Sequence, residues 1–350
     1  MKIYNLLSFT LIVLCLVGCV SEPGPPIDTA ELDASIEAVS TEWNGTMIYN
    51  HPDNPFHQEI PDEYEVHPNS TEMIDLIKSI TGDNYTNTFL STGDYSIPVY
   101  IASDTTATRN IEFYLYGKPP GKTHMLNVPF VQGSQPAKGG DSHYTVIQKD
   151  SRCVYEFWLF DYNKAGGGNA ISLDDSGIYQ DGRASVAAGW SNLQGIIWPS
   201  ELKEGEIKHA LSFSVPVTNA NGHVPPATKN DGALSNNEYA IPEGARIRIK
   251  PEINIDTIQN IGSVERTVYK AIQKYGMFCG DTNGAGISIR TIAPMSANAD
   301  AFPDDFDVSS NLGLHYLKSF PLDYLEVINF GEIIPSEVKD YVDHGCSEWN

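Results

Sequence analysis

Short runs of alternating apolar and polar residues recur along most of the chain, with Gly- and Pro-rich turns between them. Runs rich in β-branched and aromatic residues favour strands, whose successive side chains point to opposite faces of a sheet. Many short strands separated by turns indicate a sandwich or a barrel. The pattern predicts strands at residues 97–101, 111–116, 144–147, 153–159, 211–215, 245–249 and 286–290.

Two segments have helical periodicity instead. In residues 70–80 the apolar side chains recur on one helical face, at Met73, Ile74, Ile77 and Ile80. Residues 264–275 repeat this pattern, with Ser263 able to cap the start and Gly276 following the last turn. We therefore expect a mainly β fold. It would be an antiparallel, jelly-roll-like β-sandwich with two or three short packed helices, formed by residues 37–350 as a single domain.

The first nineteen residues follow neither pattern. A positive charge at Lys2 precedes a mostly apolar run, which ends in the residues LVGC at positions 16–19. This is typical of a secretory signal peptide, and Leu three residues before a Cys with Gly directly before it is the lipoprotein version. We expect residues 1–18 to be the signal peptide and Cys19 to carry the lipid. The alternative is an ordinary signal peptide that happens to end in Cys.

Residues 19–36 are then a lipidated, Pro-rich tether that holds the domain off the membrane. We expect a secreted lipoprotein, with the lipid on Cys19 as its membrane anchor, at the cell surface on the outer face of the membrane. The formal net charge of −23 makes this an acidic protein and argues against nucleic acid as a partner. No cofactor is expected.

Three cysteines remain after the signal peptide and the lipid site, at Cys153, Cys279 and Cys346. Outside the cell one pair could form a disulfide, which would leave one thiol. The sequence does not select the pair. The three are too scattered for a zinc site, and no metal is expected.

The segment 139–147 (GGDSHYTVI) is the first that could carry chemistry. On a strand Asp141 and His143 point to the same face, where the carboxylate can orient and charge the imidazole as a general base requires. The alternative is a structural Asp–His hydrogen bond at the entrance of a strand.

The segment 153–160 (CVYEFWLF) is the second. Alternation points Glu156 and Trp158 one way, and Tyr155 and Phe157 the other. A carboxylate beside an exposed aromatic ring is typical of sugar sites, because the ring stacks on C–H faces and the acid contacts hydroxyls or the leaving oxygen. Alternatively, Trp158 is a core residue and a neighbouring strand satisfies Glu156.

Arg246, Arg248 and Lys250 share one face of a predicted strand. In so acidic a chain they could bind an anionic substrate such as a uronate or a sulfated glycan. They could equally form an outer sheet face that neighbouring acids neutralise.

Six segments occur in an order that resembles a family of secreted bacterial and fungal proteins with motifs G-D-x-H, Y-E, R-x-R-x-K and K-Y-G-M. They lie at 54–60, 66–70, 140–143, 155–156, 246–250 and 274–278, and the resemblance covers about residues 43–330. This uncharacterised family has no established activity. The resemblance therefore implies secretion and a single domain, and no particular reaction.

The residues that match the family's motifs are Asp141, His143, Glu156, Arg246, Arg248, Tyr275 and Asp281. The chain departs from the pattern at Ser142, where the family has Arg. It also departs at 181–189, which is one residue shorter and lacks the family's second Asp. If that Asp is catalytic in the family, this chain would be inactive or would only bind.

Two functions are consistent with these observations. The first is binding or cleavage of extracellular carbohydrate, the latter as a polysaccharide hydrolase or lyase. Asp141, His143 and Glu156 would then be catalytic, and the substrate would contact Trp158, Arg246, Arg248, Tyr275 and Asp281. The second is a non-catalytic cell-surface or assembly protein in which these residues are structural. Convergence of these side chains in an open cleft would favour the first function, and burial in paired contacts the second.

Overall fold

A computed structural model describes residues 43–81, 88–231, 236–284, 286–297, 301–308 and 313–350. The predicted signal peptide, the lipid site at Cys19 and the tether lie outside these ranges. Within them, no helix is long and apolar enough to cross a bilayer.

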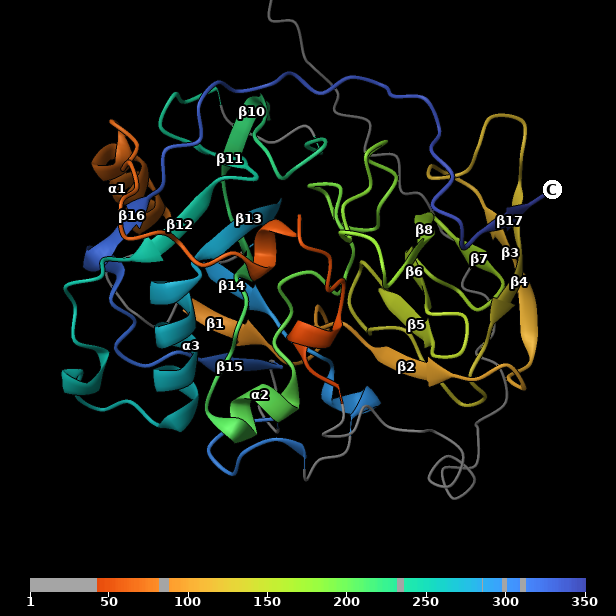
Figure 1. Ribbon diagram of the computed structural model, residues 1–350, viewed down its shortest axis with the longest axis horizontal. Helices are drawn as coiled ribbons and strands as arrows, with labels where there is room; N and C mark the ends of the chain where they lie inside the picture. Colours follow the sequence, from red (N-terminus) through yellow and green to blue (C-terminus); the bar gives the residue numbers. More distant parts are fainter. Residues whose placement is uncertain (1–42, 82–87, 232–235, 285, 298–300, 309–312) are drawn as a thin grey trace, which may run out of the picture.

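The largest sheet has seven strands and fills one half of the molecule (Figure 1). In spatial order these are β15 (Leu314–Tyr316), β1 (Thr88–Ser91), β14 (Ile287–Arg290), β9 (Leu211–Val215), β13 (Met277–Thr282), β12 (Arg246–Ile249) and β16 (Leu325–Val327). Two helices, α1 (Ser70–Thr81) and α3 (Ser263–Lys274), pack on one of its faces.

The apolar face of each helix explains this packing. Met73, Ile74 and Ile77 of α1 are buried in one cluster with the inward side chains of α3 and of the central strands. Burial of an aliphatic side chain contributes about 1.5–3 kcal/mol, so helix and sheet stabilise each other. Gly276 follows α3 at a positive φ of 72°, as predicted for the residue that ends this helix.

The other half contains two four-stranded sheets packed face to face. One is β2 (Val99–Ala102), β5 (Tyr144–Gln148), β6 (Cys153–Trp158) and β8 (Gly167–Ser172). The second is β17 (Glu348–Trp349), β4 (His124–Pro129), β3 (Thr108–Phe113) and β7 (Lys164–Ala165). Between them lies an aromatic cluster that includes Tyr144, Phe157 and Phe113. The described residues also include the short pair β10 (Thr218–His223) and β11 (Ile241–Glu243) and the helix α2 (Pro199–Glu204).

Several links join the two halves. Ile97, just before β2, bridges Ile292, just after β14. The C-terminal segment leaves β16, crosses the molecule and ends in β17 on the opposite side (Figure 1). A disulfide between Cys153 and Cys346 fixes this segment to β6, and Cys279 is a buried free thiol. The pairing that the sequence left open is therefore Cys153 with Cys346.

The mainly β, sandwich-like fold with a few short packed helices is confirmed, and each of the seven predicted strands is present. The sheets are mixed, since β1 pairs in parallel with β14, β9 with β13, and β2 with β5. Parallel neighbours need long crossover connections. Here each parallel pair joins strands that are distant in the chain, and the alternation within single strands does not reveal this.

Candidate functional site

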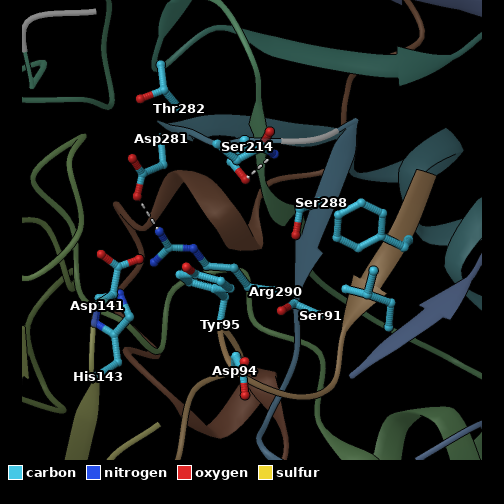
Figure 2. A pocket seen from close by; sticks show the side chains of 14 residues that line it. Ser91, Asp94, Tyr95, Asp141, His143, Ser214, Asp281, Thr282, Ser288 and Arg290 are labelled. Carbon is cyan, nitrogen blue, oxygen red and sulfur yellow. Dashed lines mark hydrogen bonds and ion pairs between the residues drawn. The ribbon is translucent and has the colours of Figure 1, made fainter. Parts of the chain in front are cut away.

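A cleft lies where the polar face of the seven-stranded sheet meets the loops that flank β5 and β6. It consists of two cavities of about 460 and 370 Å³. Both are lined by Asp141, His143, Asp281 and Thr282, so the two cavities meet at these residues. Figure 2 shows the first cavity, with Asp281 and Asp141 on either side of the Arg290 guanidinium.

Strand alternation places Arg290 in this cleft. Ile287 and Ile289 of β14 belong to the core beneath α1 and α3, so Ser288 and Arg290 point to the opposite face. Ser288 pairs with Ser214 of β9, which also lines the cavity. The sheet therefore presents hydroxyl groups around one buried guanidinium.

A β-bulge places Asp281. On β13, Cys279 pairs with Phe213 but Asp281 already pairs with Ser214, so Gly280 is the extra residue. A bulge of this kind redirects the side chains that follow it. Without it, Asp281 would share the core face with Cys279, which is fully buried. A Cβ at position 280 would lie 2.7 Å from the Trp190 ring, so the position suits Gly.

Asp281 and Arg290 form the central ion pair of the cleft. The Arg290 Nη2 atom lies 2.7 Å from Asp281 Oδ2, and Arg290 is only 8% exposed. Burial raises the pKa of Asp281 to about 7 against the opposing effect of Arg290. The nearby carboxylates of Asp231 and Asp141 raise it further. Asp281 therefore exchanges a proton close to neutral pH, as a general acid requires.

A tight turn before β5 carries Asp141. Gly139 N–H donates to the Asp94 carbonyl, and a Cβ at position 139 would lie 2.5 Å from that oxygen. This close approach joins the turn to the loop that holds Tyr95. The Leu159 N–H donates to the Asp141 carbonyl at 2.7 Å, and Trp158 Nε1–H donates to Asp141 Oδ1 at 3.0 Å. The Asp141 carboxylate is thus oriented by a ring that also lines the cleft.

His143 is a neutral acceptor at the junction of the cavities. Burial lowers its pKa to about 4, and the charge of Arg290 lowers it further, while Asp141 and the Phe157 carbonyl raise it. The Nδ1 atom has no hydrogen-bond partner among the residues that the structure describes. A neutral imidazole keeps one ring nitrogen able to accept a proton.

The second cavity has a different lining. Tyr116 and Trp158 form an aromatic wall, with ring centroids 5.7 Å apart, and Lys229 Nζ lies 5.0 Å from the centroid of the Tyr116 ring. Burial lowers the pKa of Lys229, whereas Glu243, Asp281 and Asp231 raise it. Burial also raises the pKa of Glu243 well above its usual range, and the charges of Asp281 and Asp231 raise it further.

The structure does not bring Glu156 to the cleft. It points to the same side of β6 as Trp158, as alternation predicts, but it is fully buried. Its Oε2 accepts hydrogen bonds from Ser191 Oγ at 2.6 Å and from Asn192 N at 2.7 Å. The segment that contains these donors covers the carboxyl group, so Glu156 supports the cleft wall from behind.

Glu156 should make stability depend on pH. Burial raises its pKa to about 7, against the hydrogen bonds from Ser191 and Asn192. Between pH 4.5 and 7 the native state keeps a proton that the unfolded chain releases, so stability falls as pH rises through this window. We expect Glu156→Gln to remove about 3 kcal/mol of that fall, as measured by urea denaturation between pH 5 and 8. Glu63→Gln, at an exposed site, should keep the wild-type dependence. Identical curves for all three proteins would contradict the assignment.

Arg246, Arg248 and Tyr275 also lie outside the cleft. Arg246 Nε donates to the Tyr275 carbonyl at 2.8 Å, and its Nη2 donates to Gln58 O. Arg248 lies over the Tyr64 ring, with its Nε 4.0 Å from Glu326 Oε1. The expected outward face of β12 is covered by the chain around residues 58–64, and the neighbouring strand β16 supplies Glu326 beside Arg248. These two arginines therefore join segments of the fold.

Of the predicted site residues, the structure gathers Asp141, His143, Trp158 and Asp281 and leaves the other four elsewhere. The residues that the sequence analysis missed are Tyr95, Tyr116, Lys229, Asp231 and Arg290. Of these residues, only Arg290 could have been found from the sequence. On the predicted strand 286–290 it alternates with the apolar Ile287 and Ile289, so it shares the polar face of the strand with Ser288. No group of three or more His, Cys, Asp or Glu residues in the described ranges is arranged to hold a metal ion.

The cleft therefore brings the carboxyl groups of Asp141 and Asp281 together with a neutral imidazole, the buried guanidinium of Arg290 and the rings of Tyr95, Tyr116 and Trp158. A carboxyl group that exchanges a proton near neutral pH, as Asp281 does, beside a second carboxylate is an arrangement that acid–base catalysis can use. Comparison of the chain with protein-family models, with curated proteins and with solved structures gives no match, so the geometry of this cleft is what bears on its function.

Proposed function

We propose that the protein is an extracytoplasmic, lipid-anchored lipoprotein whose cleft binds and hydrolyses extracellular carbohydrate. The observation that supports this most is that Asp141 and Asp281, from separate parts of the chain, face one cleft beside Tyr95, Tyr116 and Trp158. Aromatic rings take the C–H faces of sugars, and a pair of carboxyl groups is the usual machinery for glycoside hydrolysis.

The proposed roles follow from the two environments. Protonated Asp281 donates its proton to the glycosidic oxygen as the C–O bond to the anomeric carbon breaks. Asp141, oriented by Trp158, accepts a proton from a water molecule whose oxygen bonds to that carbon. One water is consumed, both products leave as free sugars, and solvent returns the proton from Asp141 to Asp281.

One observation favours the non-catalytic alternative. Each acid has a protein partner, since Asp281 pairs with Arg290 and Asp141 accepts from Trp158. In a surface or assembly protein these contacts would simply fix the cleft wall. The two functions differ in whether a glycan product forms.

The deciding experiment is a glycan array combined with a polysaccharide-degradation screen on the purified full chain in mild detergent. We expect binding to a defined set of glycans and release of reducing ends from them. Binding without product would support the non-catalytic alternative. Neither binding nor product across acidic and neutral glycans would overturn the carbohydrate proposal.

The anchor has its own test. Cys19→Ala removes the thiol that takes the lipid, so the protein should move from the membrane fraction to the soluble fraction and lose incorporation of labelled fatty acid. Cys279→Ala, at a buried thiol, is the matched control and should leave the distribution unchanged. Membrane retention of the Cys19 variant at the wild-type level would contradict lipidation at this residue.

A further inference from the structure

We propose that the cleft takes a neutral oligosaccharide of at least two sugar residues, one in each cavity, with the scissile bond over Asp141 and Asp281. This rests on the proposed function and adds the class of substrate to it.

The shape of the cleft indicates two subsites. Each cavity, at about 460 and 370 Å³, is within the roughly 300–1,000 Å³ range of small-molecule sites. Each also has its own aromatic surface, Tyr95 in the first and Tyr116 with Trp158 in the second. The two carboxylates lie where the cavities meet, so a chain that fills both cavities places an intersugar bond beside them.

The charges around the cleft disfavour an anionic sugar. Its lining contains the acids Asp94, Asp141, Asp231 and Asp281 but only two cations, Lys229 and Arg290. After Lys2, the residues outside the described ranges include no Lys or Arg that could change this balance. Uronates and sulfated sugars would meet a surplus of negative charge, in a protein whose net charge is already −23.

The hydrogen-bonding groups of the first cavity also suit a neutral sugar. Hydroxyl side chains line it at Ser91, Ser214 and Ser288. A hydroxyl group can both donate to and accept from a sugar hydroxyl, and it carries no charge that would hold a carboxylate.

A neutral substrate also limits which cleavage reaction is chemically possible. An elimination needs a carboxyl group next to the carbon that loses its proton, which a neutral sugar lacks. Arg246 and Arg248, the cations that the sequence analysis assigned to such a group, lie outside the cleft and contact other parts of the fold. Hydrolysis, with one water consumed for each bond, is the cleavage that remains for this substrate class.

The test compares two ligand series on the purified full chain by calorimetry and product analysis. The first contains neutral glucan, mannan and xylan oligosaccharides of one to six residues, and the second contains oligogalacturonides of the same lengths. We expect affinity to rise at least tenfold from one to two or three residues in a neutral series, with little binding of the uronates.

Two variants test the proposed sugar subsites, one in each cavity. Tyr95→Ala in the first cavity and Lys229→Met in the second should each lower the affinity for the oligosaccharide about tenfold, toward that of the monosaccharide. Tyr324→Ala, at an exposed tyrosine outside the cleft, is the matched control. Thermal denaturation checks that each variant is folded, and Tyr95 is 56% exposed, so its loss should not affect folding.

The outcomes separate the two proposals. If no glycan binds or is cleaved, the proposed function and this inference fall together. If oligogalacturonides bind as well as the neutral series or better, the neutral class is wrong while the function stands. If mono- and oligosaccharides bind equally, or if Lys229→Met has no effect, the two-subsite arrangement is wrong.

Discussion

Asp281→Asn is expected to lower kcat for glycan hydrolysis by about 10²–10⁴-fold, the usual contribution of a general acid. Asn keeps an oxygen that can accept a hydrogen bond from Arg290, but its amide group is too weak an acid to protonate the glycosidic oxygen. Substrate affinity should therefore change only a few-fold. Because burial raises the pKa of Asp281 to about 7, wild-type kcat should fall about tenfold per pH unit above that value, as the acid loses its proton. The variant's residual activity should lack this alkaline limb. Steady-state rates between pH 5 and 9 measure both effects.

Two companion variants make the result interpretable. Asp141→Asn should also lower kcat, but without removing the alkaline limb, because the group that loses its proton there is Asp281. Asp62→Asn, an equal charge change at an exposed site, should leave the rate unchanged. Full activity in Asp281→Asn, or an unaltered pH profile, would exclude Asp281 as the acid.

The strands and the side of each strand were predictable, because alternation is a local property of the sequence. It separated Glu156 and Trp158 from Tyr155 and Phe157 on β6, and the structure has the latter two in one core cluster. The alternation of side chains does not reveal which other segments pack over a face of the strand. Trp158 reaches the cleft, whereas the segment carrying Ser191 and Asn192 buries Glu156 on the same side.

The composition of the cleft was less predictable, because it depends on contacts between distant parts of the chain. Lys229 follows the β10 strand and Tyr116 follows β3, and only the tertiary fold brings them to one cavity. The direction of Asp281 depends on the bulge at Gly280, which shifts the register between β13 and β9. A Gly in a strand is compatible with such a bulge but does not reveal which face the next side chain takes.

Another buried acid, Glu201 on α2, joins three segments of the chain outside the cleft. Its side chain is 3% exposed and accepts from Gly45 N at 2.9 Å and Trp198 N at 3.0 Å. His209 Nε2 lies 3.1 Å from the same carboxylate, and His209 Nδ1 lies 2.8 Å from the Ala210 carbonyl. Since both ring nitrogens face acceptors, the imidazole is protonated. Glu201 thus joins the turn at Gly45, the helix α2 and the residues just before β9.

Glu201→Ala should lower the free energy of unfolding by about 3–5 kcal/mol, because it leaves a buried imidazolium and two backbone N–H groups without an acceptor. Glu204→Ala, at the exposed end of the same helix, should cost less than about 0.5 kcal/mol.

Although burial lowers the pKa of His209, Glu201 and the Ala210 carbonyl raise it above its usual value overall. The pair's contribution is therefore complete below about pH 6.5 and is lost as pH rises through the raised value. Urea denaturation at pH 5.5 and pH 9 should show the larger difference between wild type and Glu201→Ala at the lower pH. An equal difference at both values would mean that Glu201 acts through its backbone contacts alone and that His209 is neutral in the folded protein.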